Sequence, residues 1–130
     1  PDFAAMHAGQ DYQDIGAELA AWLAVRIARC EAAGIARARL VVDPGIGFAK
    51  NAAQSAAALS DVARLHELGC PVLVGASRKS FIGHLADVCE TADRLPGSLA
   101  AALWAVSQGV HVLRVHDVAE TRQALEIWPG

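Results

Sequence analysis

The sequence has few charged residues, few aromatic residues and no long hydrophobic run. Of its 130 residues, 19% are charged and 5% are aromatic, and the formal net charge is −3. This charge gives no reason to expect a basic surface for a nucleic acid. No apolar run approaches the roughly 18 residues of a membrane-spanning helix, and no basic start followed by an apolar stretch marks a signal peptide. We therefore expect neither a nucleic-acid nor a membrane partner.

Cysteine is also scarce. Cys30, Cys70 and Cys89 are far apart, odd in number and free of any CxxC spacing. This pattern argues against a disulfide framework and against a zinc site. Unpaired thiols are typical of a reducing compartment, so we expect a cytoplasmic protein. The hydrophobic share of 54% is enough for a core, and the length suits one domain.

Hydrophobic periodicity predicts helices that alternate with short strands. Apolar residues recur at helical spacing in three segments, and short apolar runs follow them. Asp117, with Glu120 three residues later, resembles a capping box that opens a last helix. The predicted helices cover residues 11–33, 52–68 and 97–108, and the predicted strands cover residues 40–42, 71–74 and 110–115.

Strands separated by helices predict right-handed βαβ units and a parallel sheet, hence an α/β fold. Strands this short and apolar are expected to be covered on both faces, as in a doubly wound sheet or a closed barrel. In both architectures ligands bind beyond the carboxyl ends of the strands. Each predicted strand ends in polar residues, so we expect a carboxylate, a lysine, an arginine and a histidine to share one cleft.

Asp43 and Phe48 belong to a glycine-flexed loop that follows the first predicted strand. Asp43 precedes a Pro-Gly pair, so it either forms a turn or accepts hydrogen bonds from an amine-bearing ligand. Phe48 lies among the glycines of the segment 45–50. It either walls a flat substrate or anchors the loop.

Cationic residues follow the other two predicted strands. Arg78 and Lys79 either lie in a solvated loop or hold a ligand, and the N–H groups of a helix that begins nearby would suit an anion. Arg114 and His116 alternate along a strand end, so they point to the same side. They either bind a phosphate or pyrophosphate group or form a surface ion pair with Asp117.

Five segments carry a resemblance to a known family. In chain order they are "CEAAGI", "DPGIGFAK", "LVGASRKSFIG", "GSLAAALWAVSQG" and "RVHDV". Together they resemble the dihydropteroate synthase family, whose last three barrel strands carry such signatures. The resemblance implies part of a (β/α)8 barrel, a magnesium cofactor and a reaction of folate biosynthesis. In that reaction 6-hydroxymethyl-7,8-dihydropterin pyrophosphate condenses with 4-aminobenzoate to give 7,8-dihydropteroate and pyrophosphate.

The resemblance also implies a role for each matching residue at the pterin. Asp43 would bind the amino and ring N–H groups of the pterin. Lys79 would contact the pterin and help to shape the aminobenzoate site, and the backbone of Gly75 would face the pterin. Asp43 and Lys79 are therefore expected to be catalytic residues as well as substrate-binding residues.

Four further residues are expected at the remaining parts of the substrates. The N–H group of Ser80 would meet the aminobenzoate carboxylate, and Phe48 would pack beside the aminobenzoate ring. Arg114 and His116 would bind the pyrophosphate and act in catalysis, and Arg114 could stack on the pterin. The implied mechanism is dissociative: pyrophosphate leaves, a pterin-stabilised cation forms, and the amine attacks it.

The match covers only the last three strands of an eight-stranded barrel. We therefore expect residues 1–130 to form a single partial barrel domain with the first five strands absent, and magnesium ligands in the missing part. The full-length protein is expected to be a homodimer through its last helices, and the segment alone to be inactive. Two alternatives are a pterin- or methyltetrahydrofolate-binding barrel of a corrinoid methyltransferase, against which "SRKS" and "RVH" argue, and a fragment with no activity.

Overall fold

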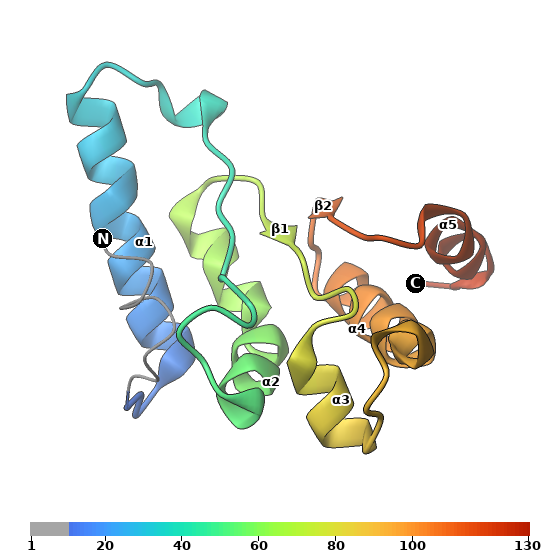
Figure 1. Ribbon diagram of the computed structural model, residues 1–130. Coiled ribbons are helices and arrows are strands. Elements are labelled where there is room, and N and C mark those ends of the chain that lie inside the picture. Colours follow the sequence, from blue (N-terminus) through green and yellow to red (C-terminus); the bar gives the residue numbers. More distant parts are fainter. Residues whose placement is uncertain (1–10) are drawn as a thin grey trace.

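The structure is a computed structural model that describes residues 11–130, in which five α-helices and two short strands follow in the order α1, α2, β1, α3, α4, β2, α5 (Figure 1). The helices are α1 (Ile15–Ala32), α2 (Ala52–Ser60), α3 (Ser80–Ala86), α4 (Leu95–Ser107) and α5 (Val118–Ile127). The strands are β1 (Leu73–Val74) and β2 (Val112–Leu113). Three 3-10 segments lie between these elements: η1 (Arg37–Arg39), η2 (Val62–Leu68) and η3 (Thr91–Arg94).

The strands are parallel, as the sequence predicts, but they are shorter than predicted. The predicted strand at 40–42 contributes one isolated parallel bridge, between Val42 and Val72. The ladder is short near this bridge because Pro44 and Pro71 have no N–H group to donate. The register of the remaining pair places Leu73 opposite Val112 and Val74 opposite Leu113.

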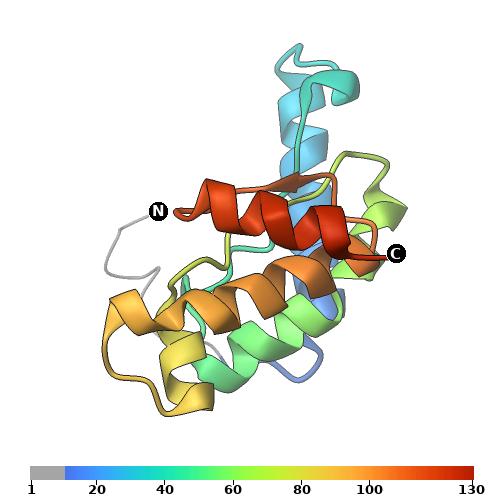
Figure 2. The ribbon, with the colours of Figure 1, turned by 90° about the vertical axis from the view of Figure 1, so that its right-hand side faces the viewer.

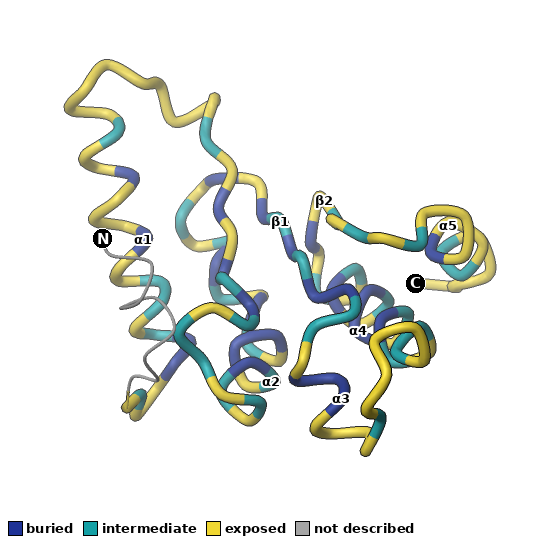
Figure 3. The backbone as a smooth tube through the Cα atoms, in the orientation of Figure 1, coloured by how far each residue is buried: buried dark blue, intermediate teal, exposed yellow. Residues whose placement is uncertain are grey.

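One face of this small sheet is packed and the other is open. Val42 and Val74 are only 4% and 1% exposed, whereas Val41 is 53% and Val112 is 42% exposed. Successive side chains of a strand point to opposite faces, so the burial alternates because helices cover only one face. The expectation of cover on both faces is therefore wrong for residues 11–130. Figure 3 shows the buried stretches where the strand segments meet α2, α3 and α4.

The helices form a layer over the packed face. Figure 2 shows α5, α4 and α2 side by side, and these helices are in contact in that order. α1 continues the layer by packing on η2 and α2. The side chains buried between this layer and the strands form one apolar core, whose least exposed members are Ile46, Val62, Val72, Val74 and Ala105.

The predicted helix over 52–68 is divided into α2 and the 3-10 segment η2. α2 begins at a capping box in which Asn51 and Gln54 exchange hydrogen bonds of 2.9 and 2.8 Å. After the division, Arg64 Nε donates to Asp61 Oδ2 at 2.9 Å. Three residues per turn bring positions i and i+3 into line, so this ion pair fits the tighter helix. Gly69 ends η2 with φ +68°, the left-handed conformation in which glycine often ends a helix.

The predicted capping box at Asp117 is wrong. Asp117 does precede α5, but its side chain makes no capping hydrogen bond. Its carboxylate is instead bound by the guanidinium of Arg78. The first turn of α5 is held by Thr121, whose Oγ1 donates to the Asp117 carbonyl at 2.7 Å. Tertiary pairing with a cation has therefore replaced the local cap.

Candidate active site

The residues that follow the three strand segments lie at one edge of the sheet. Gly75 follows β1 and lies beside Arg114, which follows β2: a Cβ atom at Gly75 would be 3.7 Å from the Arg114 Cβ. Lys79 is close enough to both Asp43 and Arg114 for their charges to shift its pKa. Lys79 therefore lies near both an acid and an arginine, whereas the sharing of one cleft by these groups and His116 stays a prediction.

The loop after Val42 is built around a turn at Asp43. Asp43 Oδ1 accepts the N–H of Gly45 at 2.7 Å, so the turn interpretation of this residue is confirmed. Gly45 and Gly47 have φ of +67° and +82°, a region that favours glycine. Asp43 is exposed, and its second oxygen can still accept a hydrogen bond from a ligand. The turn therefore orients the carboxylate and leaves it usable for binding.

Lys79 joins this loop to the loop after β1. Its Nζ donates to the carbonyl of Ile46 and lies 4.7 Å from the centroid of the Phe48 ring, a cation–π contact. Burial lowers the pKa of Lys79, the charge of Asp43 raises it, and the charge of Arg114 lowers it. The half-buried ammonium group is thus held by a carbonyl and an aromatic ring and lies within the influence of the charges of Asp43 and Arg114.

Lys50 is a second lysine at this place, and the sequence analysis did not select it. Its Nζ donates to the carbonyls of Gly45 and Phe48, each at 3.0 Å. Burial lowers the pKa of Lys50, while Asp43 raises it and Lys79 lowers it. The chain contains only these two lysines, and both belong to the site. That scarcity is the signal in the sequence that could have revealed Lys50.

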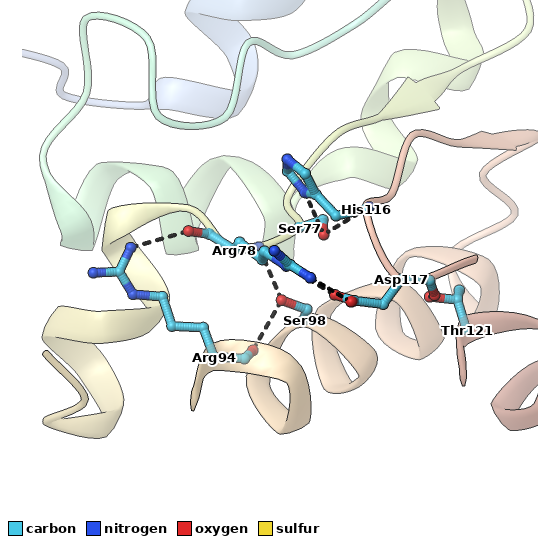
Figure 4. Close-up of polar contacts among 7 residues, drawn as sticks. All are labelled: Ser77, Arg78, Arg94, Ser98, His116, Asp117 and Thr121. Carbon is cyan, nitrogen blue, oxygen red and sulfur yellow. Dashed lines mark hydrogen bonds and ion pairs between the residues drawn. The ribbon is translucent and has the colours of Figure 1, made fainter. Parts of the chain in front are cut away.

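His116 is fixed by Ser77, a residue that the sequence analysis did not select. Ser77 Oγ accepts the backbone N–H of His116 at 3.2 Å and lies 2.9 Å from its Nδ1 (Figure 4). The hydroxyl hydrogen of the buried Ser77 can donate to Nδ1. When Ser77 donates this bond, a neutral His116 ring carries its proton on Nε2, where it can serve as a donor beyond the strand end.

Arg78 and Asp117 form the ion pair that the sequence had assigned to other partners. Arg78 Nη2 lies 2.5 Å from Asp117 Oδ1, and Arg78 Nε lies 3.0 Å from Oδ2. The hydrogen bonds from Arg78 lower the pKa of the Asp117 carboxyl group. The surface ion pair proposed for Arg114 and His116 is thus made by Arg78, so of the two adjacent cations Lys79 alone contacts the loop of Asp43.

Ser80 is the first residue of α3, and Lys79 occupies the N-cap position. Ser80 is exposed, and its carbonyl lies 2.8 Å from Nδ1 of His84. The seven predicted site residues therefore come from three loops that follow the strand segments. An apolar hollow of about 310 Å³ lies elsewhere, among α2, α3 and α4, and no predicted site residue lines it.

The described residues do not provide a metal centre. Among residues 11–130, no three His, Cys, Asp or Glu side chains lie close enough together to hold a metal ion. Magnesium prefers several oxygen ligands in octahedral geometry. The donor set of the described chain does not fit that requirement, and we assign no chemical step to a metal through these residues.

Over the same residues, no helix is long and apolar enough to cross a membrane.

The fold and the site define a class of protein: a parallel α/β protein that gathers charged side chains beyond its strand ends. A model of the family described as "Pterin binding enzyme" matches residues 2–116. The chain belongs to this pterin-binding enzyme family.

Relatives of known name are dihydropteroate synthases. The chain is 46% identical over 122 residues to dihydropteroate synthase of Escherichia coli K12, covering 94% of this chain and 43% of that protein. It is 44% identical over 126 residues to the protein of the same name from Neisseria meningitidis serogroup B, covering 95% and 44%. The chain thus spans less than half the length of these curated relatives.

Solved structures agree with the sequence relatives. Dihydropteroate synthase from Xanthomonas albilineans in complex with 7,8-dihydropteroate has a TM-score of 0.88 and 47% identity, covering 91% of this chain and 45% of that chain. The enzyme from Thermus thermophilus in complex with 4-aminobenzoate has a TM-score of 0.89 and 45% identity, covering 98% and 51%. The chain therefore has the fold of part of a (β/α)8 barrel, as predicted.

Proposed function

We propose that this chain is a segment of a dihydropteroate synthase, a transferase of folate biosynthesis. The substrates would be 6-hydroxymethyl-7,8-dihydropterin pyrophosphate and 4-aminobenzoate. The observation that carries the proposal is the convergence of Asp43, Lys79 and Arg114 at one sheet edge, in a chain of the pterin-binding family. We also propose that residues 1–130 form a single partial barrel domain.

The pterin would lie against the residues that follow the first two strand segments. Asp43 is the acceptor for the amino and ring N–H groups of the pterin, because its turn leaves one carboxylate oxygen for a ligand. Lys79, half-buried beside it, donates to a ring acceptor or carbonyl of the pterin. Gly75 has no side chain, so its backbone faces the ligand in this proposal, beside Arg114.

The pyrophosphate would lie beside the residues that follow β2. Arg114 and His116 are both exposed there, and Arg114 has a planar guanidinium suited to phosphate oxygens. A proton on Nε2 of His116 gives a further donor to the leaving group. Arg114 also stacks on the pterin in this proposal, so that one side chain contacts both parts of the substrate.

The 4-aminobenzoate would lie between Phe48 and the start of α3. Phe48 offers an exposed ring fixed from behind by Lys79, and such a ring packs well against a flat aromatic substrate. The N–H group of Ser80 is directed to the carboxylate of 4-aminobenzoate in this proposal. The solved complex of the Thermus thermophilus relative with 4-aminobenzoate supports a site of this class in the family.

The mechanism we propose is dissociative. Arg114 and His116 stabilise the negative charge that develops on the departing pyrophosphate. Asp43 stabilises the cation that forms on the pterin when the C–O bond to pyrophosphate breaks. Phe48 and Ser80 hold 4-aminobenzoate so that its amine forms the C–N bond, after which the nitrogen loses one proton to solvent. No covalent intermediate with the protein is required. The selected residues thus form three sets: one acts on the departing pyrophosphate, one on the pterin cation and one on the attacking amine.

The proposal also includes a magnesium cofactor and a location in the cytoplasm. Magnesium, when bound, would neutralise charge on the pyrophosphate, and the residues described here only bind and orient the organic substrates. We propose a cytoplasmic location because Cys30, Cys70 and Cys89 are free thiols, which are typical of a reducing compartment.

We further propose that the whole protein is a homodimer through its last helices. The apolar hollow among α2, α3 and α4 supports this, because its rim exposes Leu85 and Trp104. Exposed apolar patches of this kind are typical of helix–helix interfaces. Sedimentation velocity of the whole protein would give a dimer mass, and Leu85→Asp would shift it toward the monomer. An unshifted monomer mass in the unmutated protein would contradict the proposal.

The function is tested in a protein that we call the completed barrel. It joins this chain to the part of Escherichia coli dihydropteroate synthase that the chain does not match. We expect the completed barrel to form 7,8-dihydropteroate and the 130-residue chain alone to form none. Pterin binding without any binding of 4-aminobenzoate, even with pyrophosphate present, would contradict the synthase and favour a pterin-binding barrel of another class.

A further inference from the structure

Arg78 has an unusual backbone conformation immediately before the candidate active-site lysine. Its φ is +56°, in the left-handed region that side chains other than glycine rarely adopt. Such residues persist only where their surroundings hold them, and they gather at functional sites. Any relaxation at Arg78 would rotate the chain that carries Lys79. The neighbours of Arg78 therefore decide where Lys79 lies.

Two residues at the start of α4 hold the backbone of Arg78 from both sides. Ser98 Oγ accepts the Arg78 N–H at 2.9 Å, and Arg94 Nη1 donates to the Arg78 carbonyl at 3.0 Å (Figure 4). The two are themselves linked, because Ser98 Oγ donates to the Arg94 carbonyl at 2.9 Å. Ser98 is buried, so water cannot readily replace it as the acceptor. Both peptide groups that flank the Arg78 Cα thus have fixed partners.

The guanidinium of Arg94 is fixed by a second contact. Its Nη2 donates to the carbonyl of Cys89 at 3.0 Å. The group therefore bridges two carbonyls, one in the loop after β1 and one before η3. Arg94 acts as a brace between these segments and not as an exposed cation.

The side chain of Arg78 is held at the other strand end. It makes two hydrogen bonds to the Asp117 carboxylate, which is 16% exposed. Beside this pair, Ser77 contacts both the backbone and the ring of His116. Arg78 therefore ties the loop after β1 to the segment after β2, and a glycine at 78 could adopt the same φ but could not make this tie.

We propose that Ser98, Arg94 and Asp117 are positioning residues that hold Arg78 in its left-handed conformation and thereby place Lys79 for the pterin substrate. This inference rests on the proposed function and extends it to residues that do not touch the substrates. It assigns to the start of α4 a role in binding that is separate from its part in the core. In this proposal the backbone conformation of Arg78 is held by these three residues, and the position of Lys79 follows from that conformation.

The first test compares two serine substitutions in α4 of the completed barrel. Ser98→Ala removes the acceptor of the Arg78 N–H, whereas Ser107→Ala removes an exposed serine that donates to the Trp104 carbonyl and accepts from Gln108 Nε2. We expect Ser98→Ala to raise the KM for the pterin pyrophosphate about tenfold while kcat changes less than about threefold. Ser107→Ala should leave both constants within about twofold. Equal kinetics for the two variants would overturn the proposal.

We call the contacts of Ser98, Arg94 and Asp117 with Arg78 the clamp. The second test asks whether glycine at position 78 makes the clamp dispensable. Because glycine adopts positive φ without help, Ser98→Ala should cost less than about twofold in KM when Arg78→Gly is already present. A role of Ser98 in stability alone would give the same loss in both backgrounds. A loss of about tenfold in the Arg78→Gly background would therefore overturn the clamp.

A third measurement separates failure of the clamp from failure of the proposed function. Hydrogen exchange of the Arg78 amide needs no turnover, and we expect Ser98→Ala to accelerate it at least about tenfold, with no change in Ser107→Ala. If the unmutated completed barrel forms no 7,8-dihydropteroate, the proposed function is overturned and this exchange decides the clamp. Unchanged exchange at Arg78 in Ser98→Ala overturns the clamp whatever the activity.

Discussion

Lys79 lies over the ring of Phe48, with Nζ 4.7 Å from the ring centroid, while the same ammonium group donates to the carbonyl of Ile46. One side chain thus connects the loop after β1 to the glycine-flexed loop of Asp43. The proposed contacts with the pterin and with 4-aminobenzoate therefore both depend on the position of Lys79. A change on either side of this pair should affect both substrates, but to different extents.

Replacement of Phe48 by leucine should affect 4-aminobenzoate most. The variant loses an aromatic face for the substrate and a cation–π contact of about 0.5–2 kcal/mol with Lys79. We expect the affinity for 4-aminobenzoate, measured by calorimetry with pyrophosphate present, to fall about tenfold and pterin affinity to fall less. Phe48→Tyr keeps the ring and serves as the control. Equal losses of both affinities would contradict the placement of Phe48.

Replacement of Asp43 by asparagine should nearly abolish pterin binding without unfolding the loop. The asparagine Oδ1 can still accept the N–H of Gly45, so the turn is preserved. The amide places an N–H₂ group where the pterin N–H groups need an acceptor, and an unmatched polar contact of this kind costs about 1–3 kcal/mol or more. Calorimetry of the completed barrel with the pterin pyrophosphate measures the loss, and thermal unfolding provides the control. Unchanged pterin affinity would remove Asp43 from the site.

The two lysines should titrate below the ordinary lysine range. Burial lowers the pKa of both Lys50 and Lys79 from 10.5, and Asp43 only partly offsets this. Because the chain has two lysines, a ¹³Cε titration of a lysine-labelled chain gives two signals, which Lys50→Met assigns. We expect both midpoints below 10.5. Midpoints at or above that value would mean that the ammonium groups are fully hydrated.

The same shifts predict how stability changes with pH. Between the lowered folded pKa and 10.5, the unfolded chain binds more protons than the folded chain. The free energy of unfolding should therefore rise with pH through this window, and the penalty for the buried charge is complete below it. Denaturant unfolding of the parent and of Lys79→Met at several pH values measures the effect. The parent should gain stability relative to the variant as pH rises, and a constant difference would contradict the shift.

The sequence predicted the elements that depend on local pattern and missed the contacts made between distant segments. The helices, the parallel order and the gathering of Asp43, Lys79 and Arg114 follow from periodicity and from the topology of βαβ units. Asp117 shows the limit. Its spacing to Glu120 favours a cap, but Arg78, 39 residues earlier in the chain, binds its carboxylate instead. A one-dimensional pattern contains no information about such a partner.

The open face of the sheet was missed for a similar reason. Short apolar strands such as 40–42 indicate burial, and the sequence cannot say which residues provide it. Within residues 11–130 the helices cover only the side of Val42 and Val74. Val41 and Val112 are exposed because successive side chains of a strand point to opposite faces. The predicted positions of the strands are therefore not in error.

The packing of α4 against α3 should tolerate no side chain at Gly97. A Cβ atom at this position would lie 2.3 Å from Cγ2 of the buried Ile82. We expect Gly97→Ala to destabilise the fold by about 1–3 kcal/mol through overpacking, although alanine is the better helix former. Ser107→Ala, in the exposed last turn of the same helix, should change stability by less than about 0.5 kcal/mol. Thermal unfolding measures both, and a stabilised Gly97→Ala would show that α4 can move away from α3.

Replacement of His116 by alanine should weaken the binding of pyrophosphate and leave the binding of the pterin nearly unchanged. His116 is fixed through Ser77, and its Nε2 proton is the proposed donor to pyrophosphate. We therefore expect His116→Ala in the completed barrel to weaken pyrophosphate binding and to lower kcat by about one to two orders of magnitude. The affinity for a pterin that lacks the pyrophosphate should change less than about threefold.

Ser77 gives an independent check on this assignment. Ser77→Ala leaves the imidazole in place but removes the group that fixes its tautomer, so we expect part of the His116→Ala defect. Imidazole ¹⁵N shifts would then show Nδ1 and Nε2 sharing the proton, whereas the parent should carry it on Nε2. Because the two residues act through one ring, their effects on kcat should not add in the double variant. A pterin affinity that falls further than pyrophosphate affinity in His116→Ala would move this histidine to the pterin site.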